Sequence, residues 1–307
     1  MATDAPDIKL VILIPAYNAE GTIGETMASL QAISNGWEYI DQLIVCDDGS
    51  TDNTASVVEA AGFNRCHLTL VRHDSNKGEA EAYRTMLRLL PHHIQWFLIL
   101  GHDDLALPCF IERNLEIVRQ CNESVAAVSS NYFVFGNTPE RLAHSPAERA
   151  IVFRGNSEAE IQHTAVVGCW WHISGSLINR SIWQRFNGTD PEFRYCADWD
   201  LMLRWQNAGF FVGHSLLPTT KYREHAASLG SASRSEFRDI VDRANVVRKY
   251  PSIFDRRIRA RWAGLLGLAI LRSAAKQILT GKLGTAVKGM HSSGMALLKL
   301  ISSLPQP

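Results

Sequence analysis

Acidic residues are missing from the last part of this sequence. From Arg256 to Pro307 there are nine Lys and Arg residues and no Asp or Glu. The whole chain of 307 residues has no net charge, so residues 1–255 carry 31 acidic and 22 basic side chains. This division predicts a soluble, acidic body with a basic appendage suited to anionic surfaces.

The sequence also lacks the cysteine pairs and the long apolar run that mark other classes of protein. None of its six cysteines forms a CxxC pair or a Cys/His cluster at zinc spacing, which favours a reduced, intracellular compartment. Residues 1–9 are polar and acidic and do not resemble a signal peptide, so we expect a cytoplasmic location. The longest uncharged apolar run, Trp262–Leu271, is about half the length of a membrane-spanning helix.

Apolar strands alternate with amphipathic helices over the first hundred residues. Apolar residues make up 46% of the chain, which is ample for a buried core. We expect strands at Leu10–Ile14, Leu43–Cys46, Leu68–Val71 and Trp96–Leu100, and helices at Ala19–Ile33, Ala55–Ala61 and Glu79–Leu90. Alternation of this kind predicts an α/β fold with a mainly parallel sheet flanked by helices.

The alternation weakens after Val125. Residues 126–130 and 132–135 are expected as strands, and residues 137–155 as a long loop. Helices are expected over residues 199–208 and 237–248, followed by one or two basic, Leu- and Ala-rich helices that are interrupted near Gly281.

Polar clusters follow the first two strands at their carboxyl ends, the edge of an open α/β sheet where ligands bind. Pro15, Ala16, Tyr17, Asn18 and Glu20 follow the first strand, where the tyrosine ring can stack on a base. Asp47 and Asp48 follow the second, and would repel each other unless they bound a donor-rich ligand or capped a helix. An ordinary strand-to-helix turn remains an alternative for the first cluster, and helix capping for Asp52.

The third cluster, Gly101-His102-Asp103-Asp104, is the sharpest electrostatic signal. Two carboxylates after a buried strand suit Mg²⁺ or Mn²⁺, which is held by one or two carboxylates and by phosphate oxygens. Such an ion would neutralise the charge that develops on a diphosphate leaving group. A polar loop that caps the next helix is an equal alternative.

The four motifs VILIPAYNAEGTI, IVCDDGSTDNTASVV, HDSNKGEAEAYRTML and WFLILGHDDLALP resemble, in this order, the donor half of the family 2 glycosyltransferases. The resemblance is tight over residues 8–115 and looser to about residue 230. It implies the GT-A fold of nucleotide-diphospho-sugar transferases, with a catalytic domain over residues 1–235. That domain would consist of a nucleotide-sugar-binding half (1–115) and an acceptor half (116–235), and residues 236–307 would form a basic, helical extension.

The resemblance also implies roles for individual donor-side residues. Tyr17 would contact the base, Asp48 would accept a hydrogen bond from it, and Pro15 and Ala16 would supply backbone contacts. Asp103 and Asp104 would hold the metal. The full nucleotide-sugar set is expected to be Pro15, Ala16, Tyr17, Asn18, Glu20, Asp48, Lys77, Gly78, His102, Asp103 and Arg223. The family often has an acid where this chain has Gly101, which puts the geometry of the metal site in question.

The acceptor half supplies a candidate base. Inverting transfer needs a group that takes the proton of the acceptor hydroxyl as its oxygen attacks C1. Asp198 matches the second position of the family's paired acids, whereas Ala197 replaces the first. Asp200 is an alternative base, and helix capping is an alternative role for Asp198.

Further residues complete the expected site. Arg223 can bond phosphate and His225 can join the metal shell, unless both lie in a solvated loop. Trp170, Trp171 and Trp199 can stack on an acceptor sugar, or pack in the core.

These features predict an inverting, metal-dependent glycosyltransferase of cell-surface polysaccharide assembly. We expect a UDP-, GDP- or dTDP-sugar donor, a glycan or lipid-linked acceptor, Mn²⁺ or Mg²⁺ as cofactor, and no nucleic-acid partner. The basic end suits peripheral contact with the inner, anionic face of a membrane, packing onto its own domain, or contact with a second copy. The alternatives are a nucleotidyltransferase, which would need a basic Gly-rich loop, and a binding module that has lost its chemistry.

Overall fold

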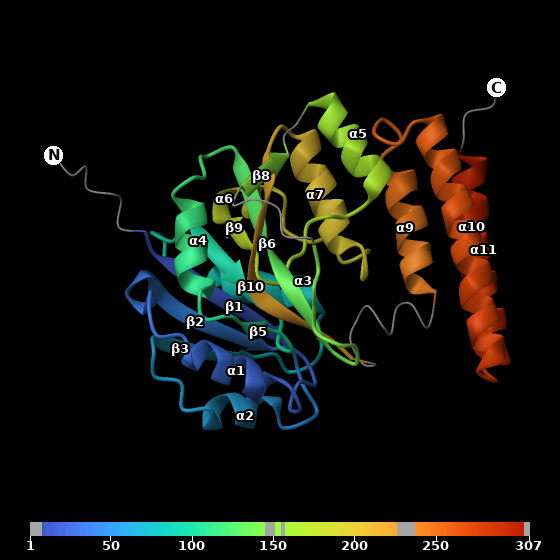
Figure 1. Cartoon of the computed structure of the whole chain (residues 1–307). Coiled ribbons are helices and arrows are strands. Elements are labelled where there is room, and N and C mark those ends of the chain that lie inside the picture. The colour runs from blue at the N-terminus through green and yellow to red at the C-terminus, as the bar shows by residue number, and fades with distance from the viewer. Residues whose placement is uncertain (1–7, 145–150, 155–156, 226–236, 304–307) are drawn as a thin grey trace.

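A ten-stranded sheet lies at the centre of the molecule, with helices on both of its faces (Figure 1). The computed structural model describes residues 8–144, 151–154, 157–225 and 237–303. The main strand order is β3-β2-β1-β4-β9-β6-β10-β5, with β7 paired to β6 and β8 paired to β10. The strands are β1 Leu10–Ala16, β2 Ile40–Asp47, β3 His67–Arg72, β4 Trp96–Ile99, β5 Leu105–Ala106, β6 Val125–Gly136, β7 Arg141–Leu142, β8 Ile151–Arg154, β9 Leu177–Asn179 and β10 Phe211–Glu224.

Helices connect these strands and continue beyond them. The α-helices are α1 Ile23–Gln31, α2 Thr54–Ala60, α3 Glu79–Arg88, α4 Phe110–Val118, α5 Glu158–Val167, α6 Arg180–Arg185, α7 Ala197–Asn207, α9 Arg238–Lys249, α10 Arg256–Leu279 and α11 Leu283–Ser302. A short 3₁₀ helix, η1, covers Trp37–Tyr39. The expected strands and helices of the first hundred residues are thus confirmed, with shifts of a few residues at their ends.

The first strand shows why the sheet is covered on both faces. Side chains alternate between the two faces of a strand, so Leu10, Ile12 and Ile14 join the buried cluster beneath α1, α2 and α4. Val11 and Leu13 join the cluster that includes α3, α6 and α7. A continuous apolar run is typical of a strand buried on both sides. β1 pairs in parallel with β2 and β4, which brings the carboxyl ends of these strands to one edge.

The second half of the sheet differs from the expectation. Residues 125–136 form one long strand, β6, instead of two, because it pairs along its whole length with β10. Irregularities in register fall within β10, between Ser215 and Thr220. The expected loop over residues 137–155 is also wrong in part, since it contains β7 and β8, each paired antiparallel to a long strand. Residues 145–150 and 155–156 lie outside the described residues.

The C-terminal helices share a buried cluster with the body. The Trp262 indole of α10 donates to the Ala165 carbonyl of α5 at 2.7 Å, and its ring lies 5.1 Å from that of Trp199 in α7. Phe237, at the start of α9, packs against Gly289 of α11 so closely that a Cβ there would lie 2.2 Å from the ring. The expected boundary at residues 235 and 236 falls outside the described residues. Within the described part of the chain, no helix has the length and apolarity that crossing a membrane requires.

Candidate active site

The loops that follow β1 and β2 are tied together by polar side chains. Asn18 has a positive φ of 48°, and its Oδ1 accepts the backbone N–H of Thr51 at 2.9 Å. Glu20 Oε2 accepts from the backbone and side-chain nitrogens of Asn53 at 3.0 and 2.9 Å. Pro15 and Ala16 are buried at the end of β1, whereas Tyr17 is 41% exposed. Asn18 and Glu20 therefore hold the turn, and the Tyr17 ring is left accessible to a ligand.

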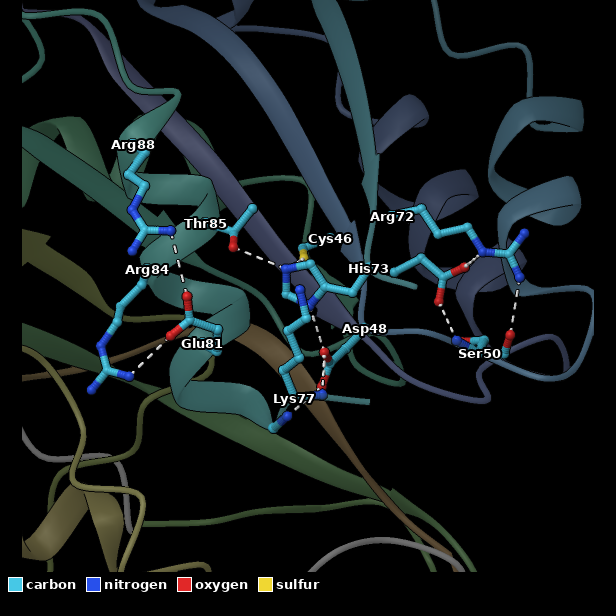
Figure 2. A network of polar contacts seen from close by, with 12 residues as sticks. Cys46, Asp48, Ser50, Arg72, His73, Lys77, Glu81, Arg84, Thr85 and Arg88 are labelled. Atoms are coloured by element: carbon cyan, nitrogen blue, oxygen red, sulfur yellow. Dashed lines mark hydrogen bonds and ion pairs between the residues drawn. The ribbon is translucent and has the colours of Figure 1, made fainter. Parts of the chain in front are cut away.

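Asp48 is the centre of a buried network of polar contacts (Figure 2). The carboxylate is 3% exposed, and its Oδ1 lies 2.6 Å from His73 Nδ1. The backbone N–H groups of Lys77 and Gly78 donate to its two oxygens at 2.9 and 2.8 Å. Thr85 of α3 bonds the far ring nitrogen of His73 at 2.9 Å. Asp48 thus holds the loop before α3, with both oxygens occupied by the protein.

The carboxylates of Asp103 and Asp104 lie close to Gly101, the position where the family often has an acid. Asp103 Oδ1 and Asp104 Oδ2 lie 3.1 and 2.9 Å from the point that a Cβ at Gly101 would occupy. A Cβ at residue 101 would require the Asp104 carboxylate to move, and the Asp103 carboxylate to shift slightly. Glycine at position 101 therefore leaves the space into which the carboxylates of Asp103 and Asp104 pack.

Asp104 is buried, and each of its oxygens accepts a hydrogen bond from the protein. Its Oδ2 accepts the Ser174 hydroxyl at 2.5 Å, and its Oδ1 accepts the backbone N–H of Arg223 at 2.9 Å. Burial, with the nearby charge of Asp103, raises the pKa of Asp104 to about 7 despite these hydrogen bonds. The expectation that Asp104 binds the metal directly stays a prediction, since each of its oxygens accepts one hydrogen bond from the protein and retains a further lone pair.

Arg223 and His225, at the end of β10, both contact Asp103. Arg223 Nε donates to the Asp103 carbonyl at 2.8 Å, and a terminal nitrogen of its guanidinium bonds Glu25 Oε2 at 2.5 Å. His225 Nε2 lies 2.9 Å from Asp103 Oδ2. Burial lowers the pKa of His102, whose Nδ1 is 3.4 Å from the Thr22 hydroxyl. The sheet thus brings residues 102–104 and 223–225 together, as the sequence predicts.

The side chains of this site suit a divalent metal ion only if a bound ligand supplies further atoms to the coordination shell of the ion. Within the described residues, no group of three or more His, Cys, Asp and Glu side chains could hold a metal by itself. Asp103 Oδ1 accepts no hydrogen bond from the described part of the chain, and Oδ2 meets only His225. Mg²⁺ and related ions keep several waters and often use one or two carboxylates with substrate phosphates. Asp103 and His225 fit an ion of that type.

Asp198 lies in the first turn of α7, half-buried, and accepts the backbone N–H of Trp199 at 2.7 Å. Burial raises its pKa to about 6, a hydrogen bond with the Cys169 thiol opposes this, and the charge of Glu79 adds to it. Asp200, the alternative base, is fully buried and bonded to Arg204, Lys249 and Tyr250 at 2.8, 2.8 and 2.5 Å. Asp200 therefore joins α7 to α9 and cannot act as a base.

Two residues that the sequence did not indicate connect Asp198 with the donor-side acids. Desolvation by the surrounding protein raises the pKa of Glu79, and the charge of Asp103 adds to this. The Tyr83 hydroxyl donates to Glu79 Oε1 at 2.6 Å. Burial likewise raises the pKa of Tyr132, with contributions from the charges of Asp104 and Asp198. Glu79 and Tyr132 are therefore each influenced by charges of both groups of acids, although they come from separate elements, α3 and β6.

The tryptophans do not form the expected stacking platform. Trp171 and Trp199 are only 2% and 1% exposed, and they pack edge-on or tilted against Trp205, Phe254 and Trp262. For these two the acceptor-binding expectation is wrong, because no face of the ring reaches solvent. Trp170 is half-buried, and its indole N–H bonds Thr164 at 3.2 Å.

The sheet order and the acids at its edge define the class of the protein. The mixed α/β architecture is that of the GT-A nucleotide-sugar transferases. It matches *Staphylococcus aureus* TarS in complex with UDP-GlcNAc with a TM-score of 0.64 and 16% identity, over 97% of this chain and 82% of that one. It also matches the mannosyltransferase PcManGT from *Pyrobaculum calidifontis*, in complex with GDP-Man and Mn²⁺, with a TM-score of 0.61 and 17% identity, over 96% and 85%.

The family follows from the sequence of the same region. The model of glycosyl transferase family 2 matches residues 11–180, more than half of the chain, and the chain belongs to that family. The protein is therefore a glycosyltransferase. A relative from *Escherichia coli*, the UDP-Glc:alpha-D-GlcNAc-diphosphoundecaprenol beta-1,3-glucosyltransferase WfaP, is 27% identical over 77% of this chain and 84% of its own. *Rhizobium meliloti* succinoglycan biosynthesis protein ExoU is 35% identical over 34% of this chain and 29% of its own.

Proposed function

We propose that the protein transfers a sugar from a nucleoside-diphosphate sugar to a hydroxyl group of a lipid-linked glycan, with inversion at C1. The observation that carries the proposal is the segment of residues 169–174, which contacts Asp198 through the Cys169 thiol and Asp104 through the Ser174 hydroxyl at 2.5 Å. A candidate base therefore lies near the acids at the donor edge of the sheet.

The donor would bind across the carboxyl ends of β1, β2 and β4. The exposed Tyr17 ring offers a face for the base, since aromatic side chains stack on flat rings. The loop around Lys77 and Gly78, held by Asp48, would line the nucleotide side. Asp48 would position that loop, and its Oδ2, which accepts one hydrogen bond, retains a lone pair for the base. Asn18 and Glu20 would act in the same way through the loops that they join.

The diphosphate would lie beside Asp103, His225 and Arg223. Asp103 and His225 would hold a Mn²⁺ or Mg²⁺ ion, which supplies positive charge to the departing nucleoside diphosphate when bound. Asp104 would keep Arg223 and Ser174 in place from beneath. Arg223 already bonds Glu25 and the Asp103 carbonyl, so its contribution to phosphate binding would require the Glu25 contact to open.

Asp198 would act as the general base. A base works best when its pKa lies near the operating pH, and a pKa of about 6 leaves Asp198 ionised at neutral pH and more basic than an ordinary aspartate. As the acceptor oxygen bonds to C1, its proton passes to Asp198 and the bond from C1 to the phosphate oxygen breaks. The electron pair of that bond leaves with the nucleoside diphosphate.

The acceptor class rests on the relatives. WfaP, by its name, transfers glucose from UDP-Glc to a sugar-diphosphoundecaprenol, and ExoU is named for succinoglycan biosynthesis. A UDP-sugar donor and a polyprenyl-diphosphate-linked sugar acceptor are therefore the first pair to test, with GDP- and dTDP-sugars next.

The test compares Asp198→Asn with the wild type. Release of nucleoside diphosphate from a panel of nucleotide sugars, with Mn²⁺ and a diphosphoundecaprenol-linked acceptor, would identify the donor. With that donor, Asp198→Asn should lower kcat by about 10²–10⁴-fold and leave nucleotide affinity unchanged. Glu116→Gln, on the exposed surface of α4, is the matched control and should retain full activity. An Asp198→Asn enzyme of normal kcat, or a product that retains the donor's configuration at C1, would refute the mechanism.

A further inference from the structure

The C-terminal helices carry most of the exposed apolar side chains of this protein. Of the fifteen large apolar residues that are exposed in the described part of the chain, eleven lie on α10 and α11. Leu279 is 86% exposed, and Leu271, Leu283 and Leu298 are each more than 60% exposed. Figure 1 shows α10 and α11 side by side at the edge of the molecule, with α9 between them and the body. We call the solvent-facing side of this helix pair the outer face.

The apolar residues of α11 form a stripe. Leu283, Val287, Met290, Leu298 and Ile301 recur at intervals of three, four or eight residues, and all of them are exposed. That spacing places side chains on one side of an α-helix. A different side of α11 carries its buried residues, which are Ala286, Gly289, Ser293, Ala296 and Leu300. The helix is therefore apolar both towards the protein and towards solvent.

Cations surround these leucines. Eight of the nine Lys and Arg residues after residue 255 are exposed, and the ninth, Arg259, is buried and donates to the Ser303 carbonyl at 2.8 Å. On α10, Arg261, Arg272 and Lys276 lie on the same side as Leu265 and Leu268 by helical spacing. No ion pair within the described ranges involves any of the eight, and no acidic residue follows Asp255.

We propose that the outer face binds the surface of an anionic lipid bilayer. Exposed leucines ringed by cations are complementary to such a surface, because the apolar side chains enter the acyl region while Lys and Arg meet anionic headgroups. A second copy of the same face is a poor partner, since it would bring up to eight further positive charges against the first eight. The inference rests on the outer face alone and does not depend on the proposed transfer reaction.

Vesicle sedimentation with the full chain tests the proposal, without donor or acceptor. The protein should sediment with vesicles of phosphatidylcholine and phosphatidylglycerol at low NaCl, much less with phosphatidylcholine alone, and less as NaCl is raised. Each basic residue at such a surface contributes about fivefold to partitioning, so Arg272→Glu/Lys276→Glu should weaken binding by about 20-fold or more. Leu279→Ser/Leu283→Ser should weaken it by at least about tenfold.

Matched controls change the same residue types outside the outer face. Leu89→Ser removes an exposed leucine at the end of α3, and Arg88→Glu/Arg119→Glu reverses two exposed charges of the body. Both controls should bind vesicles as the wild type does, and circular dichroism should show that every variant is folded. Equal binding to neutral and anionic vesicles, or binding unchanged by both outer-face variants, would overturn the proposal. So would a dimer, seen by light scattering, that the leucine substitutions dissociate while vesicle binding persists.

Discussion

Replacing Asp48 with asparagine tests whether this acid supports the donor site from within. The substitution keeps the size of the side chain but leaves one acceptor oxygen in place of two, and it adds an N–H₂ group. In the wild type the two oxygens accept from His73 and from the backbone N–H groups of Lys77 and Gly78. Whichever way the amide of an asparagine is oriented, its N–H₂ group would therefore face at least one of these three N–H groups, and that hydrogen bond would be lost.

The magnitude follows from the number of contacts and from their burial. Hydrogen bonds to a charged group contribute about 1.5–3 kcal/mol each, and an unsatisfied buried donor costs a further ~1–3 kcal/mol. With one or two bonds lost at a site that is 3% exposed, Asp48→Asn should lower the free energy of unfolding by about 3–5 kcal/mol. Because the released loop carries Lys77 and Gly78, nucleotide affinity should fall as well.

Urea unfolding followed by circular dichroism measures the first effect, and nucleotide titration of the folded variant measures the second. Glu81→Gln is a suitable control, because Glu81 belongs to the same region (Figure 2) but forms partly exposed ion pairs with Arg84 and Arg88. That control should cost no more than about 1 kcal/mol. An Asp48→Asn protein as stable as the Glu81→Gln protein would show that the Asp48 contacts do not hold the loop.

Three further predictions concern the acids and their surroundings. Activity should fall as pH drops through about 6, because Asp198 must be ionised to accept a proton and its pKa is raised to about 6; a pH–kcat profile flat to pH 5 would argue against it as base. Glu79→Gln should move that acidic limb to lower pH, since Glu79 contributes to the raised pKa of Asp198, whereas Tyr83→Phe, which keeps the carboxylate, should move it little. Gly101→Ala should weaken the Mn²⁺-dependent part of nucleotide binding by about 10- to 100-fold, because its Cβ would displace the carboxylate of Asp104; isothermal titration with and without Mn²⁺ would reveal an unchanged affinity if this packing were unimportant.

Most of the first half of the fold is predictable from short-range patterns. A strand such as Leu10–Ala16, buried on both faces, appears as an unbroken apolar run, and its neighbours follow the same rule. Parallel pairing then brings the ends of these strands together, which is why the clusters around Tyr17, Asp48 and Asp103 could be placed at one edge. The second half resists prediction because its strands pair over long distances. β6 contains buried polar residues, such as Ser129 and Asn131, whose partners lie in β10.

Within the site, the type of a residue predicted its position better than it predicted whether its side chain is buried. The sequence indicated that Asp103, Arg223 and His225 belong together, and the structure joins them. It could not show that Trp171 and Trp199 are buried, because an indole serves equally well in a core and on a sugar-binding surface. Glu79 has no sequence signal of its own. It begins α3 after a glycine with a φ of 90°, and its carboxylate is held by the Tyr83 hydroxyl of the same helix, a contact that no pattern in the sequence marks.

In the two pairs of adjacent acids, Asp47-Asp48 and Asp103-Asp104, the second aspartate makes contacts that the sequence does not reveal. In each pair the second aspartate accepts backbone N–H groups from a distant segment, Asp48 from Lys77 and Gly78 in the loop before α3, and Asp104 from Arg223 in β10. These aspartates are buried and each of their oxygens already accepts a hydrogen bond from the protein, so their removal should act first on stability. Asp103, by contrast, keeps one oxygen that accepts no hydrogen bond from the described residues, so its removal should act on binding. For the second pair we therefore expect different roles, with Asp104 supporting Arg223 and Ser174 and Asp103 meeting the ligand. In the first pair Asp47 is also engaged by the protein, through Ser50 and Arg72, so neither member is expected to reach a metal ion.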